Sequence, residues 1–207
     1  MRTPLGIECL AIPSDELAFQ LASHPGPWGT STGFISISYI GFSSWHHWDN
    51  IDRSLLINDS LDVLSKQYDF SHLRHVQVNT DTLRVDRYRR LFGHLPRLAN
   101  VSFDNCPMTM DAFRLLDPLV NNAKNGGSHP AGIAHFPSLK HLLFAKVTFC
   151  SENEISDIVH LIEVLHSRQA EGYPVHSLWF KKCVNFGEAD AKLVTDAFPL
   201  LHVKITK

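Results

Sequence analysis

The sequence has little of several features that mark particular classes of protein. No segment approaches the 18 consecutive apolar residues that a transmembrane helix needs, and the first residues lack the long apolar run of a secretory signal peptide. Only four cysteines occur among 207 residues, which excludes a disulfide-stapled scaffold. These absences predict an intracellular, reduced protein, cytoplasmic or nuclear, without a membrane partner.

An excess of charge of one sign is missing as well. The formal net charge is −2, from 19 basic and 21 acidic residues, so the chain as a whole has no basic footprint for nucleic acid. What is present is apolar: 44% of the residues are hydrophobic, including 13 Phe and four Trp. A chain of this composition can bury a sizeable core and is not disordered throughout.

One apolar pattern recurs along the chain: an apolar residue, two others, an apolar residue, one other, and an apolar residue. Its clearest copies are 95–103 and 136–144, each of which opens on an apolar residue followed by Pro. The alternating end of the pattern is typical of a half-buried strand. Seven copies predict strands near residues 7–12, 34–39, 73–78, 98–103, 139–144, 175–180 and 200–205.

Helical patterns follow most of these copies. We predict helices at 14–19 with Ser14 as N-cap, at 54–66, at 84–93, from Thr109 to about 120, from the Ser151–Glu154 capping box to about 165, and at 188–198. Strand and helix alternate at irregular intervals of roughly 25 to 41 residues, which predicts parallel strands with crossover helices. We therefore expect one α/β domain over residues 1–207.

The irregular spacing favours stacked units over a symmetric barrel. An ordinary doubly wound α/β domain is the alternative architecture. No glycine-rich phosphate loop follows any predicted strand, which weakens a nucleotide-binding version of that alternative. The stretches 23–33 and 121–130 are rich in Gly, Pro, Ser and Asn and are predicted loops.

Two cysteines occupy equivalent positions in their copies of the pattern. Cys106 follows Val101 by five residues, and Cys183 follows Leu178 by five. Together with the 136–142 segment, a capped helix ending near residue 168 and a strand that ends in Cys183, this arrangement resembles the C-terminal part of fungal F-box/leucine-rich-repeat-like proteins, best over about 70–207. The resemblance implies an irregular leucine-rich-repeat-like solenoid, with parallel strands on one face and helices on the other. It also implies that the two cysteines satisfy loop backbone groups from inside.

The same resemblance carries a functional expectation. Members of that family commonly join a cullin–RING ubiquitin ligase through an N-terminal F-box, and their repeats hold the substrate. No Leu-Pro-x-Glu-Leu opening of an F-box occurs here, so we expect either a fragment or a stand-alone repeat protein. The implied role is the substrate-recognition part of a ubiquitin-ligase adaptor, with cullin–RING machinery as a partner only where a longer chain supplies an F-box.

Strand alternation predicts which residues face outward on the sheet. The first predicted row is Cys9, Ser36, His75, Asn100, His141, Ser177 and His202. The second is Ala11, Ser38, Gln77, Ser102, Leu143, Trp179 and Lys204. The third is Pro13, Ile40, Asn79, Asp104, Ala145, Lys181 and Thr206. This face is small and polar apart from Leu143 and Trp179.

We therefore expect a non-catalytic protein–protein interaction module that needs no cofactor. The predicted contacts are His75, His141, Leu143, Trp179 and Lys181, with the exposed Trp as the main anchor. For Trp179 the alternative is that a loop of the same chain covers it.

Three histidines of the first row raise the question of a metal site. One strand lies between His75 and His141 and another between His141 and His202, so each pair is roughly 10 Å apart and cannot share an ion. Cysteine or serine catalysis has no motif in the sequence.

The competing functional hypothesis is a metal-dependent or acid–base enzyme that uses the Trp45–Asp49 segment. His46, His47 and Asp49 are the candidate ligands, although adjacent histidines in a strand point to opposite faces. A loop whose two tryptophans pack on the repeat edge is the alternative.

Finally, five arginines cluster in the middle of the chain. They are Arg84, Arg87, Arg89, Arg90 and Arg97. This is the one patch in the sequence that suggests an acidic partner, and a solvated helix face is the alternative.

Overall fold

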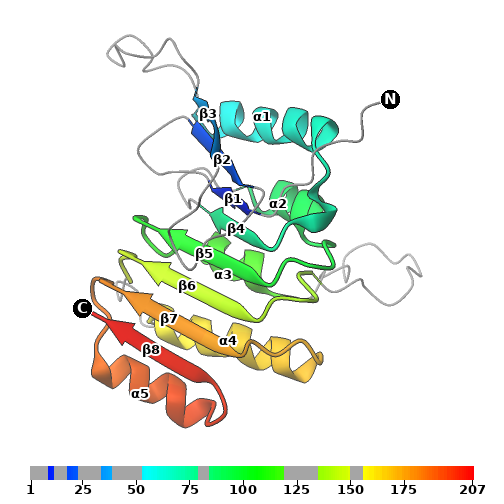
Figure 1. Cartoon of the computed structure of the whole chain (residues 1–207). Helices are drawn as coiled ribbons and strands as arrows, with labels where there is room; N and C mark the ends of the chain where they lie inside the picture. The colour runs from blue at the N-terminus through cyan, green and yellow to red at the C-terminus, as the bar shows by residue number, and fades with distance from the viewer. Residues whose placement is uncertain are drawn as a thin grey trace.

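The computed structural model describes residues 9–11, 18–22, 34–38, 53–78, 84–118, 135–149 and 156–207. Eight strands in these ranges form one open sheet in the order β3-β2-β1-β4-β5-β6-β7-β8 (Figure 1). The strands are β1 (Cys9–Ala11), β2 (Ala18–Ala22), β3 (Phe34–Ser38), β4 (His75–Val78), β5 (Asn100–Asp104), β6 (His141–Ala145), β7 (Ser177–Lys181) and β8 (His202–Thr206). Neighbours from β4 to β8 pair in parallel and β1 pairs in parallel with β4, whereas β2 is antiparallel to both β1 and β3. The fold class is therefore mixed α/β.

Helices cover one face of this sheet (Figure 1). They are α1 (Arg53–Gln67), α2 (Val85–Phe92), α3 (Met110–Leu116), α4 (Asp157–Ala170) and α5 (Glu188–Ala197), with a short 3₁₀ turn, η2, at Phe70–His72. Each helix contacts the next, from α1 to α5. Strands and helices thus stack in the same order from β4 to β8, and the opposite face of the sheet carries no helix among the described residues.

A turn with one repeated hydrogen bond precedes four of the parallel strands. The N–H of the leucine before the strand donates to the carbonyl oxygen three residues earlier. These pairs are Leu73–Phe70, Leu98–Leu95, Leu139–Phe136 and Leu201–Phe198. The apolar-Pro-x-Leu pattern, in which Ser71 replaces Pro before β4, therefore encodes a turn. The strands begin two residues after the predicted starts at 73, 98, 139 and 200.

A second repeated feature ends the central strands. Asn105, Lys146 and Lys182 follow β5, β6 and β7 directly, and all three have a positive φ of 50° to 52°. Their N–H groups donate to the carbonyl oxygens that close the neighbouring strands, those of Ala145, Lys181 and Thr206, at 2.7–2.9 Å. Asparagine tolerates this left-handed backbone well, while lysine adopts it rarely.

The core lies between the sheet and the helices. Phe103, Phe144 and Phe180 occupy one register across β5, β6 and β7, and all three are almost completely buried. Their rings stack with centroids 5.6 Å and 5.2 Å apart, nearly parallel. This ladder, extended by Phe149 and Phe186, is the centre of the apolar cluster.

The N-terminal part of the sheet differs from the prediction. The helix expected at 14–19 is wrong where it is described, because Ala18 and Phe19 belong to β2. The strand near 34–39 is confirmed as β3, but it pairs with β2 at the outer edge instead of lying between β1 and β4. The first three strands form an antiparallel meander, which needs short connections and no crossover helix.

The remaining predicted helices are present in the structure, but some begin or end at other residues than predicted. Predictions at 54–66, 84–93 and 188–198 are confirmed by α1, α2 and α5. Thr109 caps α3 as expected, since its Oγ1 accepts from the Ala112 N–H at 3.3 Å, but α3 ends at Leu116. The cap of α4 is Ser156, whose Oγ accepts from the N–H of Ile158. The predicted capping box and both predicted loops lie outside the described residues.

Arg168 at the end of α4 is completely buried. Its guanidinium donates to the carbonyl oxygens of Leu116 at 2.9 Å, His135 at 3.3 Å and Phe136 at 2.6 Å. Burial lowers the pKa of Arg168 to about 10, against an opposing contribution from Asp117, so the side chain stays charged at neutral pH. A single cation thereby joins the end of α3 to the turn before β6.

Candidate protein-binding face of the sheet

The face of the sheet without helices is built from side chains in register. Across β4 to β8 the first row is His75, Asn100, His141, Ser177 and His202. The second is Gln77, Ser102, Leu143, Trp179 and Lys204. Asp104, Ala145, Lys181 and Thr206 form the third. These partners agree with the predicted rows, because the period-two pattern and the preceding turn fix the register.

Ser36 and Ser38 do not join these rows between β1 and β4. Both belong to β3, where they pair with Gln20 and Ala18 of β2. The predicted positions Pro13, Ile40 and Asn79 lie outside the described residues.

Leu143 and Trp179 form the apolar centre of the face. They are direct partners on β6 and β7, and both are half-buried. The indole N–H of Trp179 donates to Thr206 Oγ1 at 3.0 Å, and Lys204 Nζ lies 4.5 Å from the ring centroid, within cation–π range. The last strand therefore holds the indole in place.

Two histidines of the face form hydrogen bonds with serines of the neighbouring strand. His141 Nδ1 lies 2.7 Å from Ser177 Oγ, and His75 Nε2 lies 3.0 Å from Ser102 Oγ. Burial lowers the pKa of His75 to about 4. The pKa of His141 is also lowered, mainly by burial and then by His176 and Lys140. Both rings are therefore mainly neutral at pH 7 and act as hydrogen-bonding groups.

The five predicted contact residues fall into two groups. His141, Leu143, Trp179 and Lys181 lie together on the adjacent strands β6 and β7. His75 lies on β4, separated from them by β5. The Trp45–Asp49 segment, with His46, His47 and Asp49, lies outside the described residues.

The two cysteines differ in burial, because Cys183 is only half-buried. Cys106 is buried, and the Cys183 thiol donates to the carbonyl oxygen of Phe144 at 3.2 Å. Burial raises the pKa of Cys183, which disfavours a reactive thiolate. Val147 takes the equivalent place after β6.

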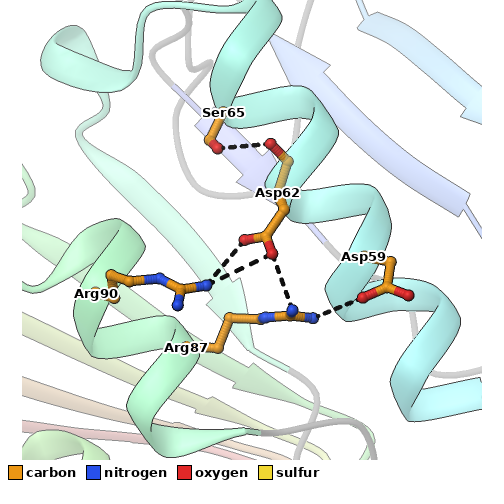
Figure 2. Close-up of polar contacts among 5 residues, drawn as sticks. All are labelled: Asp59, Asp62, Ser65, Arg87 and Arg90. Carbon is orange, nitrogen blue, oxygen red and sulfur yellow. Dashed lines mark hydrogen bonds and ion pairs between the residues drawn. The ribbon is translucent and has the colours of Figure 1, made fainter.

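Most arginines of this cluster contact other groups of the chain, and Figure 2 shows two of them, Arg87 and Arg90, beside the aspartates of α1. Arg87 of α2 forms ion pairs with Asp59 at 3.1 Å and Asp62 at 2.9 Å, both on α1, and Arg90 pairs with Asp62 at 3.2 Å. Arg89 donates to backbone carbonyls at the end of α3, and Arg97 contacts His72 at 2.8 Å. Arg84, Arg90 and Arg97 are exposed and Arg87 and Arg89 are half-buried. The surface of this cluster is therefore largely solvated, and an acidic partner would have to displace the contacts that its arginines already make.

Sequence reasoning missed the residues that hold the indole and those that surround the face. Thr206 and Lys204 were placed in rows but not connected with Trp179. Lys146 and Lys182 were not singled out, although the segments 136–146 and 173–182 contain lysine and no acidic residue. That local imbalance was the available signal.

Two further features are absent from the described part of the chain. Its His, Cys, Asp and Glu side chains form no group of three that could hold a metal ion. None of its helices has both the length and the hydropathy that a membrane span requires.

Comparisons of the chain with protein-family models, curated proteins and solved structures gave no match.

Proposed function

We propose that the chain is a non-catalytic protein-recognition module, built as an irregular leucine-rich-repeat-like solenoid, that binds a protein partner on the face formed by β4 to β8. The observation that carries this proposal is the registered face itself. Five parallel strands present three aligned rows of side chains, and no helix covers them among the described residues. Repeat proteins use such aligned surfaces for binding.

Repetition of local geometry supports the solenoid arrangement. Three features recur in successive units. They are the turn before the strand, a carbonyl oxygen that accepts from two consecutive N–H groups where the next strand starts, and the left-handed residue at the strand's end. For example, the carbonyl oxygen of Arg74 accepts from both Ala99 and Asn100, and that of Lys140 accepts from both His176 and Ser177. Each unit contacts its neighbours, as expected for a stacked array.

The more specific role follows from the family resemblance. We propose that the module is the substrate-recognition part of an intracellular ubiquitin-ligase adaptor, with cullin–RING proteins as partners only where a longer chain carries an F-box. Support for this comes from the repeat pattern, from the buried position of Cys106 and from the hydrogen bond of Cys183 to the Phe144 carbonyl oxygen.

Quantitative affinity enrichment from a cell extract tests the binding face. We expect Leu143→Ala, Trp179→Ala and His141→Ala to reduce the capture of specific partners about tenfold or more, as for central anchors of an interface. Leu193→Ala, at a 56% exposed position on the helix side, is the matched control. Circular dichroism verifies that each variant is folded.

Unchanged capture by all three face variants would refute the proposed binding face. Equal loss in Leu193→Ala would refute it as well, because binding would then not depend on which side of the sheet is altered. Cullin-adaptor proteins among the captured partners, lost when the F-box of a longer chain is deleted, would test the ligase role.

A further inference from the structure

Charge is separated between the two layers in the C-terminal half of the molecule. The strand segments 135–149, 172–187 and 198–207 contain no Asp or Glu. Their lysines are Lys140, Lys146, Lys181, Lys182, Lys204 and Lys207. The helix segments 156–171 and 188–197 carry six acidic residues against two basic ones, Arg168 and Lys192; the acidic residues are Asp157, Glu163, Glu171, Glu188, Asp190 and Asp196. A chain with a net charge of only −2 thus has a basic strand layer on an acidic helix layer.

Three of these lysines lie at or just after the carboxyl ends of β6 and β7, and Lys204 lies in the middle of β8. We name the four the lysine edge: Lys146, Lys181, Lys182 and Lys204. All four are exposed. Lys146 and Lys182 occupy equivalent turn positions after adjacent strands, and strands of a sheet lie about 4.8 Å apart. Among the described residues none of the four forms an ion pair, whereas Lys207 pairs with Glu188 at 3.8 Å.

The lysine edge adjoins the apolar centre of the face. Leu143, Trp179 and Lys204 are successive partners in one row, and Ala145 and Lys181 are partners in the next. A partner chain lying across β6, β7 and β8 would therefore contact the apolar pair Leu143 and Trp179, which we name the apolar seat, and several exposed lysines. Exposed ion pairs contribute little individually, so the apolar seat is needed for affinity while the charges provide orientation and faster association.

We propose that the lysine edge and the Leu143–Trp179 seat together bind an acidic protein segment that carries an apolar residue among its Glu or Asp side chains. This inference rests on the proposed binding function of the sheet face and names the chemistry of its partner. Nucleic acid fits less well, because its single strands require a series of stacking aromatics. Here Trp179 is the one Phe, Tyr or Trp side chain in the rows of β4 to β8, and Lys204 already lies over its ring.

Fluorescence anisotropy with synthetic probes tests the proposal. The probe is a labelled nine-residue peptide with four Glu on each side of a central Leu, and its Gln analogue and an oligothymidylate are the comparison probes. We expect Lys181→Glu/Lys182→Glu to weaken binding of the acidic peptide about tenfold or more at low salt. Lys66→Glu/Lys192→Glu has the same change of charge at exposed helix positions and should leave binding within about twofold of wild type.

The apolar seat has its own variant. Trp179→Ala should remove the preference for the central Leu over a central Gly while retaining the salt dependence that the lysines produce. Equal effects of the edge and helix variants, binding of the Gln analogue as tight as that of the acidic peptide, or tighter binding of the oligothymidylate would each overturn the proposal.

The same variants separate failure of this inference from failure of the proposed function. If captured partners are lost in Leu143→Ala and Trp179→Ala but retained in Lys181→Glu/Lys182→Glu, the face binds protein but not through an acidic segment. If partners are retained in these three variants and in His141→Ala, both proposals fail.

Discussion

At the scale of single residues, burial lowers the pKa of two histidines of the sheet face, His75 and His141, and so favours their neutral form. His75 is held against Ser102 at 3.0 Å with its pKa lowered to about 4. Protonation would place a cation in a poorly hydrated position on β4. The ring therefore contributes to stability only in its neutral form.

This gives a pH dependence with a definite sign. The pKa of His75 is lower in the folded chain than the ordinary value of 6.5, so the unfolded state binds more protons between these values. The stabilisation is complete above about pH 6.5 and is lost as the pH falls toward about 4. We expect the free energy of unfolding to decrease by up to about 3 kcal/mol over this window from His75 alone.

Urea denaturation at several pH values measures this effect. His75→Gln should flatten the pH dependence by more than His202→Gln, an exposed histidine of the same row. The pKa values of His135 and His141 are also lowered by burial. These two histidines should therefore retain part of the pH dependence of the free energy of unfolding in both variants. Equal slopes in wild type and His75→Gln would contradict the assignment.

At the scale of elements, Arg168 and Gly93 fix the turn that leads into β6. The Phe136 N–H donates to the Gly93 carbonyl oxygen at 2.6 Å, and Arg168 binds the Phe136 carbonyl oxygen at the same distance. Phe136 has a φ of 54°, a conformation that needs such support in a bulky residue. A Cβ at Gly93 would lie 2.4 Å from the Arg89 carbonyl oxygen, so the close approach requires glycine.

Removing the buried guanidinium should therefore be costly. Arg168→Met leaves carbonyl oxygens of Leu116, His135 and Phe136 without this donor, and we expect a loss of about 3 kcal/mol in the free energy of unfolding. The control is Arg74→Met, at an exposed position, which should change stability by about 0.5 kcal/mol or less. Chemical denaturation compares the two, and similar losses would argue against Arg168 as the joint between α3, α4 and β6.

At the scale of the whole molecule, the stacked phenylalanines connect successive units. Phe144 lies between Phe103 and Phe180 and also contacts Phe149. Phe144→Ala should cost about 3–5 kcal/mol, because it removes buried area and leaves a cavity at the centre of the stack. Leu200→Ala, at a fully exposed residue, should cost less than about 0.5 kcal/mol.

Differential scanning calorimetry tests whether the units unfold together. We expect Phe144→Ala to lower the melting temperature of the parallel-sheet region as one transition, because its ring contacts the units on both sides. A small change comparable to that of Leu200→Ala would contradict a shared core.

Much of the parallel sheet could be predicted from sequence because its signals are local. Leu139, Leu142 and Phe144 define both the turn and the inward face of β6, and the same spacing of Leu98, Val101 and Phe103 sets the register of β5. Local patterns could not reveal that 18–22 is a strand, since Ser14 and the acidic residues after it are equally suited to a helix start. The edge position of β3 depends on pairing with β2, which no residue of β3 encodes alone.

The sequence by itself thus determined the strands of the repeat, their inward and outward rows, and the positions of His141, Leu143, Trp179 and Lys181 on one face. Alternation and turn chemistry act over a few residues, so they can be read from the chain. Only the tertiary structure decided that Arg87 and Arg90 pair with α1, that Arg168 is buried, and that the lysines of β6–β8 and their turns form one basic layer. These outcomes depend on distances between residues far apart in the chain, and folding alone sets those distances.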